Sequence, residues 1–237
     1  MNDKLEISVV IPVLNEAQNL RELIPFLLEN AGNYIVDLFV IDGGSRDDSC
    51  AVAESLGARV VKSETASRAI QMNLGAKLAC GNMLFFIHAD TRPLSSFAED
   101  IHQAWREGYK SGCFRYRFNS SRVLLRINSW FTQFNGIFSG GGDQTLFITR
   151  DFFNTLGGYD TQFCLMEDFE LVKRIKSKTK FFIIPKSMTV SARKYQENSW
   201  LRIQLANLLI FTLFYLGVAP EKLKKSYSLF LHNGANA

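Results

Sequence analysis

The sequence lacks the short motifs of several common enzyme classes. No G-x-G-x-x-G follows the first expected strand and no G-x-x-x-x-G-K-[ST] occurs anywhere, so a dinucleotide-binding or P-loop protein loses its main support. The four cysteines are widely separated and form no C-x-x-C pair. We therefore expect buried, reduced thiols, not disulfides or a zinc site. The first residues contain no long apolar core and predict a strand, not a signal peptide, so we expect a cytoplasmic protein.

An excess of charge of one sign is also absent. The net charge is +4 in 237 residues, and the basic residues are scattered, which argues against a nucleic-acid-binding protein. A weakly basic protein suits an anionic small ligand or an acidic membrane surface. Apolar residues make up 47% of the chain, which is enough for a folded core and argues against disorder.

Short apolar segments alternate with amphipathic helical patterns up to residue 90. Continuous apolar segments separated by helices are typical of a parallel sheet covered on both faces, and they predict an α/β fold. The expected strands are residues 5–13, 36–41, 58–61 and 83–87, and the expected helices are residues 20–28, 45–57 and 66–79. Pro25 is expected to kink or split the first helix. Ser45 and Asp48 form a predicted capping box for the second.

This rhythm changes after residue 90, but no linker separates a second domain. Further strands are expected at residues 112–118, 145–149 and 181–184, with helices opening at Ser96 and Glu167. The remainder is mainly helical. We therefore expect a main domain over residues 1–195. A helical extension over residues 196–237 would pack on that domain, on a second copy of the chain or on a membrane surface.

Polar residues follow three of the expected strands directly. They are Asn15 and Glu16, then Asp42, then His88 and Asp90. In open parallel sheets, ligands bind beyond the carboxyl ends of the strands. These side chains can therefore converge on one cleft.

Four segments together resemble the family 2 glycosyltransferases of the GT-A fold. They are SVVIPVLNEAQNL, VIDGGSRDDS, LFFIHADT and MEDFE, in that order, within residues 5–195. HADT, GGGDQ and YLGVAP are similar, more narrowly, to a small bacterial branch associated with radical-SAM and selenoprotein-type genes. The resemblance implies transfer of a sugar from a nucleotide-diphosphate sugar to a hydroxyl acceptor.

The resemblance also implies residues that bind the donor. Asp42 would accept a hydrogen bond from the nucleotide base, and Pro12, Asn15 and Glu16 would line the base and ribose pocket. Read without the resemblance, Asp42 is a turn residue and Asn15 a helix cap.

The same resemblance places two further residues, Arg68 and Asn73, near the donor, and Arg193 is a candidate because it follows the last expected strand. Arg68 and Asn73 would approach the donor from a helix, although a lone arginine on a helix is usually a solvated charge. Arg193 could hold the diphosphate through two parallel hydrogen bonds. A surface basic pair with Lys194 is the alternative.

His88-x-Asp90 occupies the position of the family's D-x-D motif and departs from it. Asp90 takes the second aspartate position and is the expected ligand of Mg²⁺ or Mn²⁺, which would neutralise the diphosphate. His88 would bind the ribose, reach the metal or hold Asp90 in place. Nitrogen ligation would suit Mn²⁺ better than Mg²⁺.

Glu167 and Asp168 open an expected helix, where acidic residues are favourable without any catalytic role. The resemblance makes Asp168 the general base of a direct, inverting displacement, with Glu167 orienting the acceptor or the loop. Asp143 and Gln144, which follow three glycines, are assigned to the acceptor side because glycine allows close approach of the backbone to a ligand.

Residues 203–218 contain no charged side chain. A bilayer-spanning helix needs roughly 20 predominantly apolar residues, and polar residues interrupt this segment. We expect a helix buried in the domain or in a homodimer interface. The alternative is a helix on a membrane surface, aided by Lys222, Lys224 and Lys225, which would fit a lipid-linked acceptor.

Two other functions compete with sugar transfer. A sugar-phosphate nucleotidylyltransferase shares the expected sheet, but it needs a glycine-rich basic loop after the first strand, where this chain has PVLNE. A nucleotide-binding or scaffolding protein without catalysis is the other, supported by His88 in the D-x-D position.

Overall fold

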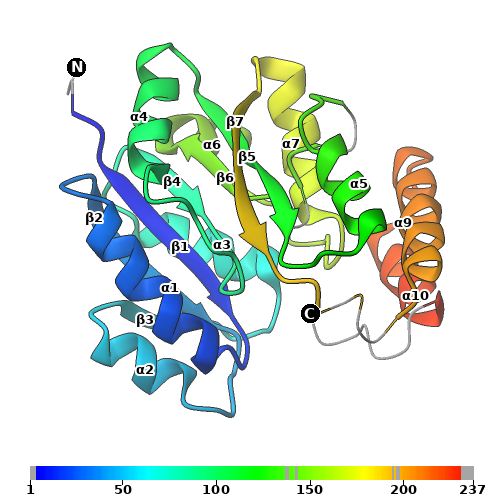
Figure 1. The fold of residues 1–237 in the computed structure, drawn as a ribbon, viewed down its shortest axis with the longest axis horizontal. Coiled ribbons are helices and arrows are strands. Elements are labelled where there is room, and N and C mark those ends of the chain that lie inside the picture. The colour runs from blue at the N-terminus through cyan, green and yellow to red at the C-terminus, as the bar shows by residue number, and fades with distance from the viewer. Residues whose placement is uncertain (1–3, 137–138, 142–143, 194, 196–197, 231–237) are drawn as a thin grey trace.

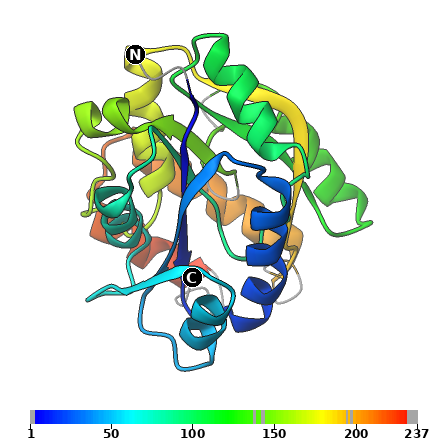
Figure 2. The same cartoon turned by 90° about the vertical axis from the view of Figure 1, so that its left-hand side faces the viewer.

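The computed structural model describes residues 4–136, 139–141, 144–193, 195 and 198–230. These residues form a seven-stranded sheet in the order β3-β2-β1-β4-β6-β5-β7, with helices on both faces (Figures 1 and 2). Strand β6 is antiparallel to β4 and β5, and the other strand pairs are parallel. The predicted α/β fold with a mostly parallel sheet is therefore confirmed.

The elements follow the sequence closely. The strands are β1 (Ile7–Val13), β2 (Ile35–Asp42), β3 (Arg59–Lys62), β4 (Met83–Phe86), β5 (Ser111–Phe118), β6 (Leu146–Thr149) and β7 (Phe182–Val190). The helices are α1 (Ala17–Asn30), α2 (Ser49–Ser55), α3 (Arg68–Leu78), α4 (Phe97–Arg106), α5 (Val123–Phe131), α6 (Arg150–Leu156), α7 (Glu167–Lys178), α9 (Trp200–Tyr215) and α10 (Pro220–Phe230).

Alternation along the central strand builds two cores. Ile7, Val9 and Ile11 of β1 pack into one cluster, which contains the buried faces of α1 and α4, while Val10 packs into the other, with α3 and α7. This is the two-residue period of a strand whose opposite faces are both covered. The sheet is therefore held from both sides, and the loops at its carboxyl edge are fixed at their bases.

Two local expectations are wrong, the first only as far as it predicts a split helix. Helix α1 is a single helix with Pro25 inside it, so the proline does not split it. Ser45 and Asp48 form no capping box, because Ser45 Oγ accepts a hydrogen bond from Asn15 N and Asp48 makes no side-chain cap bond. Asp47 instead accepts hydrogen bonds from Ala17 N and Ser49 N. One carboxylate thus links the starts of α1 and α2.

The sheet opens between β6 and β5. Strand β6 pairs with β5 only at Ser111 and Gly112. Farther along β5, the N–H groups of Tyr116 and Phe118 donate to Thr132 Oγ1 at 3.4 Å and Ser129 Oγ at 3.3 Å. Helix α5 and the residue after it therefore replace the missing strand, which satisfies backbone donors that would otherwise lie unpaired.

The C-terminal helices lie beside α5 (Figure 1). Ile203 and Ala206 of α9 share an apolar cluster with Leu125 of α5 and Phe118 of β5. No helix among the described residues combines the length and apolar character that crossing a bilayer requires. None of the four cysteines forms a disulfide. The expectation that their thiols are buried holds for Cys113 and is wrong for Cys80 and Cys164, which are exposed.

Candidate active site

The ends of β1 and β2 lie side by side, because Val13 pairs with Asp42 in register. Asp42 is 2% exposed. Its carboxylate accepts hydrogen bonds from Gly44 N at 3.1 Å and Ser45 N at 3.0 Å. The structure therefore gives Asp42 a turn-stabilising role, with the carboxylate fixed at the edge of the sheet where the sequence predicts the base pocket.

The loops after β1 and β2 are bound to each other through Asn15. Its backbone has a positive φ of 55°, its N–H donates to Ser45 Oγ at 2.8 Å, and its Oδ1 accepts from Arg46 N at 2.7 Å. Asn15 is therefore not the cap of α1, since the cap residue is Glu16. Pro12 is buried within β1 and pairs with Ile41 of β2.

Gln71 is a residue of this edge that the sequence analysis did not identify. It is 4% exposed on α3, and its Nε2 donates to Val13 O at 3.0 Å and Ile41 O at 2.7 Å. One side-chain amide therefore bridges the carboxyl ends of β1 and β2. A polar residue on the otherwise apolar inner face of α3 was the only signal in the sequence.

Glu16 brings the far end of the main domain to the same edge. Its Oε1 lies 3.0 Å from the Arg193 guanidinium in an ion pair, and its Oε2 accepts a hydrogen bond from Asn19. Arg193 comes from the segment after β7, and its side chain is 61% exposed. Two residues predicted to bind the donor therefore contact each other at the rim.

The loop after β4 contains His88 and Asp90, which are both half-buried. Arg92, which the sequence analysis also missed, fastens this loop to α1. Its Nη1 donates to Ala89 O at 3.1 Å, and its Nη2 donates to Asn19 Oδ1 at 2.8 Å. Asn19 also contacts Glu16, so the two predicted donor-binding loops belong to one hydrogen-bonded unit.

Backbone pairing ties the same loop to the far side of the sheet. Arg92 N donates to Thr189 O at 2.7 Å, and Thr189 N donates to Arg92 O at 2.9 Å. In the part of the chain that the structure describes, no three His, Cys, Asp or Glu side chains are grouped as metal ligands. The predicted metal ligands Asp90 and His88 therefore belong to no such group.

Glu167 and Asp168 begin α7 and are 5% and 9% exposed. The preceding Met166 has a φ of 69°, a conformation uncommon for a residue with a side chain. Burial raises the pKa of Glu167, and the positive charge of Arg68 opposes this rise. The charge of Arg68, predicted at the donor, therefore acts on Glu167 of the predicted catalytic pair.

Tyr159 lies close to this acidic pair. Burial raises the pKa of Tyr159 well above its usual value, and the charges of Asp168 and Glu167 raise it further. The Tyr159 hydroxyl is buried without a hydrogen-bond partner among the described residues. Tyr159 therefore lies within electrostatic range of the predicted catalytic pair, and the sequence analysis did not include it.

The side-chain amide of Asn73 forms two hydrogen bonds with the backbone of Tyr159. Its Oδ1 accepts from Tyr159 N at 2.9 Å, and its Nδ2 donates to Tyr159 O at 2.8 Å. Asn73 therefore positions the loop before α7. Because Arg68, Gln71 and Asn73 share α3, this helix links the acidic pair to the ends of β1 and β2.

Gln144 is an internal residue, 5% exposed. Its Oε1 accepts from Gly140 N at 2.6 Å, and its Nε2 donates to Phe114 O at 3.0 Å. The side chain therefore shapes the glycine loop from inside and presents no amide group to an acceptor. Asp143 lies outside the described residues.

A family model described as "Glycosyl transferase family 2" matches residues 8–165. A PGL/p-HBAD biosynthesis glycosyltransferase of Mycobacterium bovis is 26% identical over 211 residues, which cover 80% of this chain and 76% of that protein. A Synechocystis protein described as an uncharacterized glycosyltransferase is 28% identical over 113 residues, covering 44% of this chain and 36% of that protein.

Solved structures share the fold. A mannosyltransferase from Pyrobaculum calidifontis, in complex with GDP-Man and Mn²⁺, has a TM-score of 0.70 at 16% identity and covers 98% of this chain and 69% of its own. Glucosyl-3-phosphoglycerate synthase from Mycobacterium tuberculosis has a TM-score of 0.61 at 19% identity, covering 90% and 81%. The family model spans more than half of the chain and matches the strand-end loops described above; this chain belongs to glycosyl transferase family 2.

Proposed function

We propose that this glycosyltransferase moves a sugar from a nucleotide-diphosphate sugar to an acceptor hydroxyl by direct, inverting displacement. The observation that supports this most strongly is the buried pair Glu167 and Asp168, next to Arg68 on the helix that also holds the ends of β1 and β2. A carboxylate base and the positively charged side chain of Arg68 at one edge of a parallel sheet suit a reaction between a hydroxyl and an anionic donor.

In this proposal the loops after β1 and β2 hold the nucleoside. Asp42 is already oriented by two backbone N–H groups, and in this proposal its carboxylate also accepts a hydrogen bond from the base. Asn15 and Pro12 fix the shape of the same edge. Arg193 would exchange Glu16 for the diphosphate, since its exposed guanidinium can form two parallel hydrogen bonds with phosphate oxygens.

Asp90 and His88 would hold a divalent cation. One carboxylate and one imidazole fit Mn²⁺, and the remaining positions would be left for diphosphate oxygens and water. The structures of two proteins with the same fold contain Mn²⁺ with a nucleotide or nucleotide sugar, which supports this assignment. The bound cation would neutralise charge on the leaving diphosphate.

Asp168 would take the proton from the acceptor hydroxyl as that oxygen attacks the anomeric carbon. A single base suffices, because the diphosphate leaves without protonation. Glu167, whose pKa burial raises, would orient the acceptor. Asp143 stays a proposal for the acceptor side, and Gln144 would act only through the glycine loop.

Calorimetric titration with UDP and GDP, with Mn²⁺ and with EDTA, tests the donor site. We expect metal-dependent binding of one nucleotide, loss of the metal-dependent part in Asp90→Ala, and unchanged binding in Asp168→Asn. Asp151→Asn, on the exposed start of α6, is the matched control. A folded sample that binds neither nucleotide would refute the proposal.

Assembly is a further part of this proposal. Helix α9 buries Ile203 and Ala206, but it turns Leu201, Leu205 and Leu208 outward at 61%, 51% and 59% exposure. We propose that two copies of the chain form a homodimer through this apolar outer face. The alternative is that this face and the lysines of α10 contact a membrane surface, which would fit a lipid-linked acceptor. Light scattering and vesicle sedimentation of Leu205→Ser and Leu208→Ser separate the two.

A further inference from the structure

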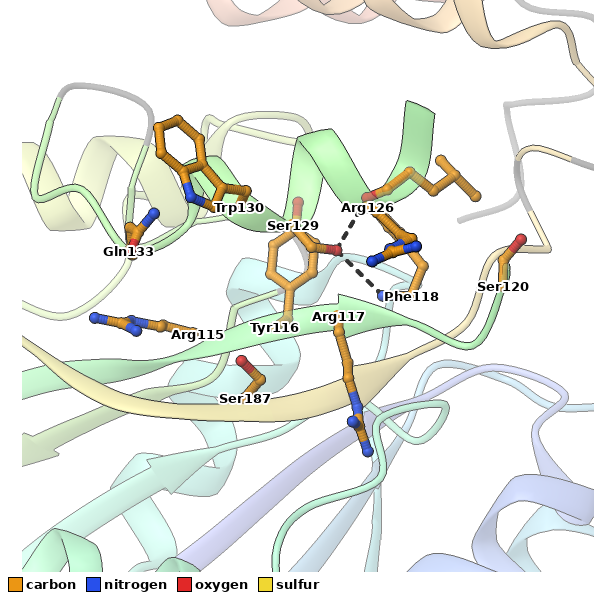
Figure 3. Close-up of a pocket in the computed structure, with 11 residues that line it drawn as sticks. Arg115, Tyr116, Arg117, Phe118, Ser120, Arg126, Ser129, Trp130, Gln133 and Ser187 are labelled. Carbon is orange, nitrogen blue, oxygen red and sulfur yellow. Dashed lines mark hydrogen bonds between the residues drawn. The ribbon is translucent and has the colours of Figure 1, made fainter. Parts of the chain in front are cut away.

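A pocket of about 460 Å³ lies between β5 and α5, outside the residues assigned above. It exists because β6 leaves β5 after Gly112 and α5 covers the rest of the strand. Figure 3 shows Ser129 of α5 above the strand, with its hydroxyl accepting from Phe118 N. Trp130, which is 58% exposed, forms part of the wall.

The lining of this pocket is basic and contains no carboxylate. Arg115 and Arg126 contribute guanidinium groups, and Ser129 and Gln133 contribute neutral polar groups. In Figure 3 the Arg126 guanidinium lies between α5 and the end of β5. Residues 108–142 include no aspartate or glutamate in the sequence, so no neighbour along the chain neutralises these arginines.

One donor in this pocket is unsatisfied. The Arg115 Nε atom is buried and has no hydrogen-bond partner among the described residues. A buried, charged donor without an acceptor is unfavourable, and native proteins rarely leave one unpaired. Because this atom is buried, an oxyanion in the pocket can supply the missing acceptor only after the Arg115 side chain turns toward it.

The pocket is connected to the loop that contains Asp90. Strand β5 runs in the same direction as β4, because β6 is antiparallel to both, so the last residues of β5 lie at the active-site edge. Arg117 points to the side of β5 opposite α5 (Figure 3), and its Nε donates to Thr189 Oγ1 at 3.2 Å. Thr189 is in turn paired with Arg92.

We infer that this pocket binds a phosphate-monoester group carried by the acceptor substrate. This inference rests on the proposed function, which it deepens by naming the acceptor as anionic. Guanidinium groups match the planar arrangement of phosphate oxygens and bind them bidentately. The phosphate can belong to a soluble metabolite or to a lipid headgroup beside the exposed Trp130 and Phe131.

Fluorescence of Trp130 provides a test that does not require transfer. The full chain is titrated with glycerol 3-phosphate, with phosphatidylcholine vesicles containing phosphatidic acid, and with pure phosphatidylcholine vesicles. We expect a saturable change with the first or the second and none with the third. Trp130→Phe identifies the signal among the three tryptophans. Saturation by the first probe indicates a soluble acceptor, and saturation by the second alone indicates a lipid.

Variants separate a specific site from general charge attraction. Arg115→Gln and Arg126→Gln should each weaken binding about tenfold, as expected for the loss of one charge-assisted hydrogen bond, while Arg126→Lys loses less. Arg106→Gln, an exposed arginine of α4, should bind as the unmodified chain does. Unchanged affinity in both Gln variants, or no saturable change with either phosphate probe, overturns the inference.

The outcome is independent of the donor site. Asp168→Asn should abolish transfer and keep phosphate binding. Saturable phosphate binding without UDP or GDP binding would refute the proposed function and leave the pocket assignment standing. Nucleotide binding without phosphate binding would overturn the pocket assignment and leave the proposed function standing.

Discussion

Glu16 and Arg193 are separated by 177 positions in the chain and meet in an ion pair of 3.0 Å. The carboxylate is largely buried, whereas the guanidinium side chain is 61% exposed. The pair therefore holds the segment after β7 against the loop after β1, and it leaves most of the cation facing solvent. This geometry suits a cation that can exchange one oxyanion for another.

Arg193→Gln is expected to weaken nucleotide-diphosphate binding much more than stability. Loss of a charge-assisted bond to phosphate should lower affinity about tenfold or more, whereas an exposed ion pair contributes about 0–1 kcal/mol to unfolding. Calorimetry with UDP or GDP and thermal unfolding measure the two effects. Arg106→Gln, exposed on α4, is the control. A stability loss with unchanged nucleotide affinity would make Arg193 a structural residue.

Gln71→Met should destabilise the fold without changing side-chain size greatly. The variant removes the hydrogen bonds that Nε2 donates to Val13 O and Ile41 O. Val13 O still accepts from Gly43 N, so the expected cost is that of lost buried hydrogen bonds, about 0.5–1.5 kcal/mol each. The melting temperature should fall by about 2–4 °C for each kcal/mol in a chain of this length. Gln103→Met, on the exposed side of α4, should change little. Equal stability of both variants would contradict the role assigned to Gln71.

Tyr159→Phe should leave the free energy of unfolding unchanged or slightly higher. Its hydroxyl is buried without a partner among the described residues, so removal of that group relieves a desolvation cost. Tyr34→Phe is the matched control, because the Tyr34 hydroxyl donates to Glu99 at 2.7 Å. Denaturant unfolding of both variants gives the comparison. A hydrogen bond usually contributes about 1 kcal/mol to the free energy of unfolding. A decrease in that free energy by more than this amount in Tyr159→Phe would show that the hydroxyl forms a hydrogen bond.

Glu167 should make stability depend on pH above its ordinary pKa of 4.5, because burial raises its pKa in the folded state. In that range the folded chain binds more protons than the unfolded chain, so the contribution of Glu167 to stability falls as pH rises through the raised pKa and is fully present only below 4.5. Glu167→Gln should therefore be more stable than the unmodified chain at pH 7 and similar at pH 4.

Denaturant titrations at several pH values check this expectation. Glu54→Gln, exposed on α2, should leave the pH dependence unchanged. Arg68→Gln should extend this dependence to higher pH, because the charge of Arg68 lowers the pKa of Glu167. The assignment fails if Glu167→Gln and the unmodified chain have parallel stability curves between pH 4 and pH 8.

The sequence by itself determined the succession of elements and the sheet edge at which to look. Periodicity is a local property, so apolar runs predicted β1, β2 and β4 within a few residues, and the polar residues after them marked Asp42 and Asp90. The sequence pattern could not predict that β6 pairs antiparallel with β4, because the direction of a strand depends on the side from which the chain re-enters the sheet.

Only the tertiary structure decided which partner each polar group has. Asn73 and Gln144 are bound to distant backbone atoms, and Arg92 and Gln71 hold the site together although neither stands in a motif. The physical reason is that a side chain's hydrogen-bond partner is set by the crossing of segments far apart in the chain. A residue's type states what it can bind, and the fold supplies what lies within reach.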